Sequence, residues 1–165
     1  MGNTEIVRGE GRRDGRREGS REGPERRRET LERLDRERDI WLSTSHSEHG
    51  PHQVPLWFWW DGAALWMCTG ETSVTVRNAR QEPRVRLALP DTVDVVLVQG
   101  EAECFPAPGV PRETGDGFAA KFGWDPREEE GSFVYLRVTP MTVRAWCGEH
   151  ELTGRVLMRA GAWVV

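Results

Sequence analysis

The chain has 165 residues, 37% of them hydrophobic, and a formal net charge of −4. This length predicts one domain with a single core, and the chain has no apolar run long enough to predict a membrane span. Residues 1–39 carry a net charge of +1 and residues 40–165 a net charge of −5. Because acidic residues are interleaved with the arginines, the charge pattern argues against nucleic-acid binding.

The first 29 residues are rich in Gly, Arg and Glu and almost free of apolar side chains. Such a segment buries too little surface to offset the entropy of ordering. We therefore expect a disordered tail over residues 1–29 and one domain over residues 30–165. The tail also lacks the apolar stretch of a signal peptide.

The domain begins with a predicted helix and a hairpin. Residues 30–39 favour a short helix that Thr30 caps, followed by a strand over residues 40–44. A polar turn over residues 45–50 leads into residues 51–60, whose aromatic and branched side chains favour a strand.

The next segment predicts a second hairpin and a short helix. The Asp-Gly pair at 61–62 indicates a two-residue turn, because Gly accepts the positive φ that such a turn needs. Residues 64–69 then return as the partner strand. A helix capped by Thr72 or Ser73 is expected to end before Pro83.

The remaining chain predicts mainly strands. Residues 84–89 alternate polar and apolar side chains. Residues 95–105 form a long strand in which Gly100 indicates a bulge or a close backbone approach, and residues 132–146 form another, in which Pro140 indicates an edge or a bend.

A short helix is expected around residues 117–122, and residues 155–158 and 162–165 predict a last hairpin. Six or more antiparallel strands with few helices favour a mainly β fold, either a closed or a split barrel.

The cysteines and histidines give weak signals for chemistry. Cys68, Cys104 and Cys147 match neither a zinc nor a redox pattern, so we expect small buried side chains in a reducing, cytoplasmic setting. His46, His49 and His52 recur every third residue, and Glu48 or His150 is a conceivable further ligand. The residues around these histidines predict a turn between strands. A zinc site needs three or four ligands that converge on the metal, so no metal site is predicted.

Two features are compatible with a ligand. Of the eight tryptophans, Trp57, Trp59 and Trp60 lie on one predicted strand and Trp66 on its partner. These tryptophans either pack in the core and at a dimer interface, or they line a pocket for a flat aromatic ligand. The polar run between Thr69 and Thr75 includes a helix start, which offers N–H groups and hydroxyls to an anion.

These segments resemble the flavin-binding split barrels related to pyridoxamine 5'-phosphate oxidase, some of which use the deazaflavin coenzyme F-420. The resemblance rests on the hairpin of residues 53–69, the turn from Thr69 to Ser73, the sequence EPRVRLALP at 82–90, and the tail at 138–163. It covers roughly residues 30–165.

The resemblance implies a homodimeric oxidoreductase with FMN or coenzyme F-420 at the dimer interface, acting by hydride transfer on a small organic substrate. Because the cofactor carries the hydride, no catalytic side chain is assigned. The implied cofactor-binding residues are Gln53, Val54, Pro55, Leu56, Trp57, Cys68, Thr69, Ser73, Val74, Thr75, Arg77, Trp146 and Arg155.

This chain departs from the family pattern where a phosphate would bind. It has Gln53 where the family often has Arg, and Val74-Thr75 where the family has an Arg-Lys pair. The absence of each charge-assisted hydrogen bond weakens the free energy of phosphate binding by about 1.5–3 kcal/mol. A non-catalytic cofactor-binding protein and a haem-binding protein on the same barrel therefore stay as alternatives. FMN and F-420 are both left open, with the acidic sequence at 100–103 closer to the F-420 group.

Overall fold

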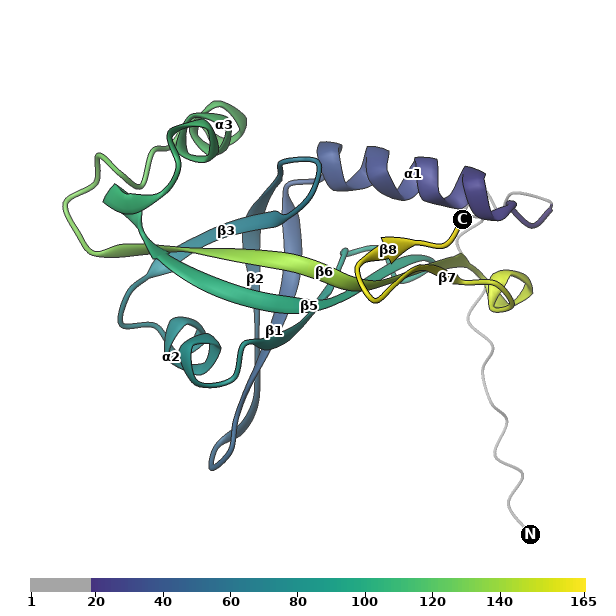
Figure 1. The fold of residues 1–165 in the computed structure, drawn as a ribbon, viewed down its shortest axis with the longest axis horizontal. Helices are drawn as coiled ribbons and strands as arrows, with labels where there is room; N and C mark the ends of the chain where they lie inside the picture. The colour runs from purple at the N-terminus through teal and green to yellow at the C-terminus, as the bar shows by residue number, and fades with distance from the viewer. Residues whose placement is uncertain (1–18) are drawn as a thin grey trace, which may run out of the picture.

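The computed structural model describes residues 19–165 (Figure 1). Its strands are β1 (Asp39–His46), β2 (Gly50–Trp60), β3 (Leu65–Gly70), β4 (Arg84–Ala88), β5 (Asp94–Pro106), β6 (Phe133–Cys147), β7 (Val156–Arg159) and β8 (Ala162–Trp163). Its helices are α1 (Gly23–Arg36), α2 (Val74–Gln81), α3 (Arg112–Phe122) and the short 3-10 turns η1 (Ala107–Gly109) and η2 (Glu149–Glu151).

The strands form one antiparallel barrel, as the sequence predicts. Their order is β3-β2-β1-β4-β5-β6, and a further pairing of β3 with β6 closes the ring. β7 and β8 continue the sheet from the second half of β6. Alternate residues of each strand point inward, where Phe58, Leu87 and Leu136 are at most 2% exposed.

β6 holds the two halves of this sheet together. Its first half, up to Val138, pairs with β3, and β7 pairs with it at Val143 and Arg144. Pro140 lies between the two pairings and opposite Gly100, beside the irregularity in the register against β5. The register against β5 shifts at Gly100, where an added Cβ would collide with the carbonyl of Thr139. The bulge and the close backbone approach expected at Gly100 are both confirmed.

The connection between β2 and β3 is longer than the two-residue turn that the sequence predicts. Trp60 pairs with Leu65, so residues 61–64 all lie in the connection. The Asp61 carboxylate stabilises it, because it accepts hydrogen bonds from the N–H groups of Ala63 and Ala64 and from the Trp66 indole (2.6–2.7 Å). The Asp61 N–H also donates to the Ala64 carbonyl at 3.2 Å, so the side-chain acceptor supplements one backbone hydrogen bond across the turn.

α1 begins seven residues before the expected start at Thr30, so residues 23–29 are helical and the expected tail boundary is wrong. Pro24 favours a helix start in the first turn. Arg21, Arg26 and Arg33 are only 6–7% exposed. Ion pairs and hydrogen bonds of these arginines hold the segment, although it has few apolar side chains. The part of the predicted tail at residues 1–18 lies outside the described residues.

The other two helices flank the barrel. α2 is capped by Ser73, whose Oγ accepts the Val76 N–H at 3.2 Å, and it ends before Pro83 as expected. α3 is longer than the predicted segment at 117–122 and packs closely on β2, because Gly117 has no Cβ to meet Trp59. None of the helices within residues 19–165 is long and apolar enough to cross a membrane.

Candidate functional site

The barrel is split along the seam between β2 and β3. These strands pair only from Phe58–Met67 to Trp60–Leu65, after which β3 continues along β6 and β2 continues along β1. The Phe58 N–H bonds to the Arg38 carbonyl on the β1 side. Successive residues of an antiparallel strand direct their backbone polar groups to opposite sides. The backbone polar groups of Gln53 and Pro55 therefore point away from β1, toward the side where β3 no longer pairs with β2. β2 therefore presents a strand edge that β3 does not cover.

A cavity of about 360 Å³ lies beside this split. Trp57 stacks flat on Phe122, with ring centroids 5.0 Å apart and planes 3° apart, and Trp124 meets its edge. The cavity is therefore largely aromatic on the α3 side. It is lined by Asp39, Pro55, Leu56, Trp57, Cys68, Phe118 and Trp124. The structure thus brings four of the sequence-predicted site residues to one cavity.

Cys68 contributes a neutral group to the cavity wall. Its side chain is buried, and burial raises the pKa of the thiol to about 12, although a hydrogen bond from the Thr69 N–H acts in the opposite direction. A protonated thiol is a poor nucleophile. Cys68, Cys104 and Cys147 are all free thiols; Cys68 is buried as expected, whereas Cys104 and Cys147 are only partly buried.

The polar run after β3 forms the start of α2. The Ser73 N–H donates to the Gly70 carbonyl at 3.0 Å, and Ser73 Oγ caps only the Val76 N–H. The N–H groups of Val74 and Thr75 lie in the first turn and have no intrahelical acceptor. The side chain of Thr75 is buried (3% exposed), so the backbone and Ser73, more than the Thr75 hydroxyl, are available to a ligand.

Trp146 and Arg155 meet each other but lie away from the split. The Arg155 guanidinium is 5.6 Å from the centroid of the Trp146 ring, and the Ala145 N–H donates to the Arg155 carbonyl at 2.9 Å. Figure 1 shows β7 and α2 at opposite ends of the barrel. Within a single chain, Trp146 and Arg155 therefore lie apart from the predicted site residues on β2 and α2.

The outer face of the barrel carries two rows of side chains that run across five strands. Gln53 Nε2 donates to Ser43 Oγ at 3.0 Å within one of them. Trp41 belongs to the other, mainly apolar row and is 41% exposed. Trp57, on the neighbouring strand β2, is 43% exposed. By strand register, the polar row is Gln53, Ser43, Arg86, Gln99 and Thr142, and the mainly apolar row is Pro55, Trp41, Ala88, Leu97 and Arg144.

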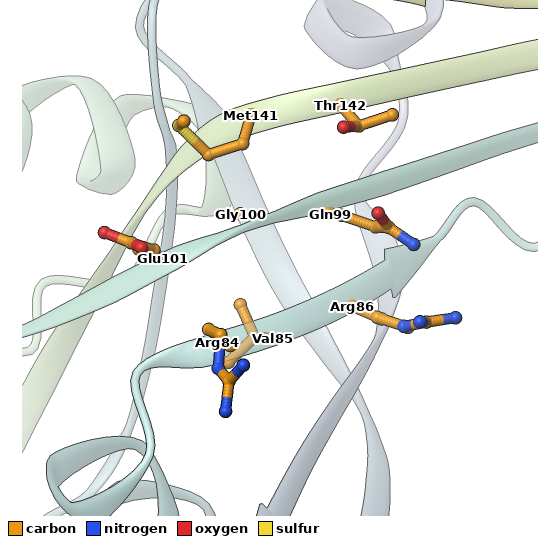
Figure 2. Close-up of a pocket in the computed structure, with 8 residues that line it drawn as sticks. All are labelled: Arg84, Val85, Arg86, Gln99, Gly100, Glu101, Met141 and Thr142. Carbon is orange, nitrogen blue, oxygen red and sulfur yellow. The ribbon is translucent and has the colours of Figure 1, made fainter. Parts of the chain in front are cut away.

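A groove of about 360 Å³ lies on this outer face where β5 and β6 shift register. Figure 2 shows the head groups of Arg86 and Gln99 at one end of the groove and the Glu101 carboxylate at the other. None of the sequence-predicted site residues lines it. The alternation of residues 84–89 already indicates that Arg84 and Arg86 point outward, but only the register places Arg84 opposite Glu101 and Arg86 opposite Gln99. The lining residues are Arg84, Val85, Arg86, Gln99, Gly100, Glu101, Met141 and Thr142.

The histidines gather at the tip of the β1–β2 hairpin. Candidate ligand atoms of His46, Glu48 and His49 lie within 4.8 Å of one another. His46 Nδ1 accepts the Glu48 N–H at 3.1 Å, and the two imidazole rings stack with centroids 4.7 Å apart. The hairpin itself thus accounts for this arrangement, and His52 and His150 are not part of it.

The closed ring of strands, its split seam and the capped helix start beside the seam define a split-barrel protein. The chain belongs to the pyridoxamine 5'-phosphate oxidase family, which its sequence matches over residues 27–147. No curated protein shows significant sequence similarity to the chain.

Solved structures share this fold at low sequence identity. General stress protein 26 from Bacillus anthracis is 21% identical, with 71% of this chain and 91% of that chain covered and a TM-score of 0.55. An F-420 reductase is 22% identical (67% and 91% covered, TM-score 0.55). An FAD-binding protein from Mesorhizobium loti is 20% identical (71% and 89% covered, TM-score 0.56).

Proposed function

We propose that the protein is a homodimeric oxidoreductase that uses FMN or coenzyme F-420 and acts by hydride transfer on a small organic substrate. Its membership of the pyridoxamine 5'-phosphate oxidase family supports this class, as do an F-420 reductase and an FAD-binding protein of the same fold. The observation that carries the proposal is the uncovered edge of β2 together with the capped start of α2, a helix that contacts both β2 and β3.

The residues around the split suit a planar heterocycle with an anionic tail. The aromatic wall formed by Trp57 and Trp124 offers apolar contact to a ring, and the backbone of Gln53 and Pro55 offers hydrogen bonds to its polar edge. Ser73 and the first N–H groups of α2 favour negative charge. Arg77 is exposed on the same helix and forms no ion pair within residues 19–165.

A second subunit would complete the site. Trp146 and Arg155 are the other implied cofactor contacts, and they lie at the far end of the same chain. The exposed Trp41 and the apolar row around it suit burial against another copy, because aromatic residues are enriched in the cores of interfaces. When bound, the cofactor supplies the hydride chemistry, while the chain binds the ring, holds the substrate and excludes water.

A titration of the purified protein with FMN and, separately, with F-420 tests the proposal. We expect quenching of the fluorescence of the eight tryptophans, with micromolar or tighter binding of one cofactor. Arg155→Ala should weaken this binding, whereas Arg159→Ala, at the exposed end of β7, should not. Absence of binding to either cofactor would refute the oxidoreductase proposal.

A non-catalytic cofactor- or haem-binding protein is the second candidate. The sparse positive charge at the start of α2 favours it. Cofactor binding without turnover, or a haem Soret band on titration with haemin, would support this candidate. The three free thiols are compatible with the cytoplasmic location expected from the sequence, which stays a prediction.

A further inference from the structure

We propose that the groove between β4, β5 and β6 binds a phosphate or carboxylate group of a ligand through Arg86. The role of this anion in the enzyme rests on the function proposed above. The site itself rests on the charges and neighbours of the residues that line the groove.

The two arginines of the groove differ in how their charge is neutralised. Arg84 makes a two-pronged ion pair with Glu82, with Nε–Oε1 at 2.8 Å and Nη2–Oε2 at 2.7 Å. Arg84 also lies opposite Glu101 in the register of β4 and β5. Its charge is therefore balanced by two carboxylates.

Arg86 has no such compensation. Its cross-strand neighbours are Gln99 on β5 and Ser43 on β1, both uncharged. It forms no ion pair with any residue in the part of the chain that the structure describes. Figure 2 shows its guanidinium at the end of the groove away from Glu101. A guanidinium in a fixed fork geometry matches the oxygens of phosphate and carboxylate.

The neighbours of Arg86 are hydrogen-bonding groups. The Gln99 amide and the Thr142 hydroxyl follow it in the same row, and each is only partly exposed. Both groups can donate to an anion. The row thus provides one positive charge with adjoining neutral donors, a combination that favours an anion over a cation.

The groove also lies within reach of the split in the barrel. Ser43 separates Arg86 from Gln53, so the two lie on strands about 10 Å apart, given a strand spacing of about 4.8 Å. A ligand that contacts the uncovered edge of β2 can therefore extend an anionic group toward Arg86. The groove has a volume of about 360 Å³. This volume is at the small end of the usual range for ligand sites and suits one part of a ligand.

Inorganic phosphate is the probe for the site. In a titration followed by NMR, we expect saturable shifts of the Gln99 side-chain amide and of the Thr142 N–H. Arg86→Gln should weaken phosphate binding by about 10- to 100-fold, the usual consequence of losing a charge-assisted hydrogen bond. The matched variant Arg84→Gln, in the same groove, should retain binding. Equal effects of both variants, or no shifts at Gln99 and Thr142, would overturn the proposal.

The source of the anion is then found by comparing FMN with riboflavin, which lacks the phosphate. If Arg86→Gln weakens FMN binding and leaves riboflavin binding intact, the groove holds the cofactor phosphate. If both affinities are unchanged while phosphate binding is abolished, the groove holds an anionic group of the substrate. Phosphate shifts in a protein that binds neither FMN nor F-420 would refute the proposed function and leave the groove site standing.

Discussion

Arg21 and Glu151 lie 130 residues apart in sequence and form a buried ion pair. Arg21 Nη2 is 2.7 Å from Glu151 Oε2, and the Arg21 backbone N–H donates to Oε1 at 2.8 Å. The two side chains are 7% and 1% exposed. The Cys147 N–H also donates to Glu151. The pair therefore fastens the segment before α1 to the turn that follows β6, next to Trp146.

Arg21→Ala should destabilise the fold by about 3–5 kcal/mol, because it leaves the buried Glu151 carboxylate without its partner. Arg28→Ala is the matched control, since Arg28 and Glu32 form an ion pair whose side chains are 59% and 57% exposed. An exposed pair contributes at most about 1 kcal/mol. Urea denaturation at fixed protein concentration measures both. Similar losses of stability for the two variants would show that Arg21 does not stabilise the fold as a buried ion pair.

The same pair predicts how stability depends on pH. Burial alone would raise the pKa of Glu151, but hydrogen bonds from Arg21 and from the Cys147 N–H lower it from 4.5 to about 2. Between these values the unfolded chain binds more protons at Glu151 than the folded chain does. The stabilisation is therefore complete above pH 4.5 and disappears as the pH falls toward 2.

We expect this decrease to be about 1–2 kcal/mol between pH 6 and pH 3, because the folded pKa of about 2 is not yet passed at pH 3. The measurement compares the free energy of unfolding of the wild type and of Glu151→Gln at pH 6, 4.5 and 3. The difference between the two proteins should narrow as the pH falls. A constant difference would mean that Glu151 has no lowered pKa in the folded protein.

Local sequence signals predicted most of the barrel. The alternation of residues 84–89, the bulge at Gly100 and the Ser73 cap before Pro83 all appear in the structure. Each of these features depends on neighbours in sequence or on backbone sterics. The mainly β barrel followed from them.

Features that depend on distant residues were missed. The early start of α1 needs Glu151, far along the chain, to neutralise Arg21. The longer β2–β3 connection needs the Trp66 indole to reach Asp61. Alternation predicts the outward position of Arg86, but its polar neighbours follow only from the register of four strands, β1, β4, β5 and β6.

Gly100→Ala tests whether the bulge depends on the missing side chain. An added Cβ would meet the Thr139 carbonyl and a methyl group of Val138, so β5 and β6 would have to separate. We expect the free energy of unfolding to fall by about 1–3 kcal/mol, as for other overpacked sites. Thermal unfolding measures it. Gly109→Ala, where a Cβ meets nothing within 4 Å, should be nearly neutral, and an equally small effect at Gly100 would contradict the tight packing.

The last prediction concerns a cofactor site shared between two subunits. Gln53 lies at the split, and Arg155 lies against Trp146 at the other end of the chain. If one site uses the Gln53 side-chain amide of one protomer as a hydrogen-bond donor and Arg155 of its partner, Gln53→Ala and Arg155→Ala homodimers should each be weak at both sites. Removing a charge-assisted hydrogen bond at Arg155 should weaken cofactor binding by about 10- to 100-fold.

A heterodimer that carries Gln53→Ala in one chain and Arg155→Ala in the other distinguishes shared from separate sites. Shared sites place both substitutions in one of the two sites and leave the other intact. The heterodimer, purified with two different affinity tags, should then bind one cofactor with wild-type affinity. Sites contained within single chains would each carry one substitution, so no wild-type site would appear. Recovery of one wild-type site would therefore show that Gln53 and Arg155 of different protomers form one site.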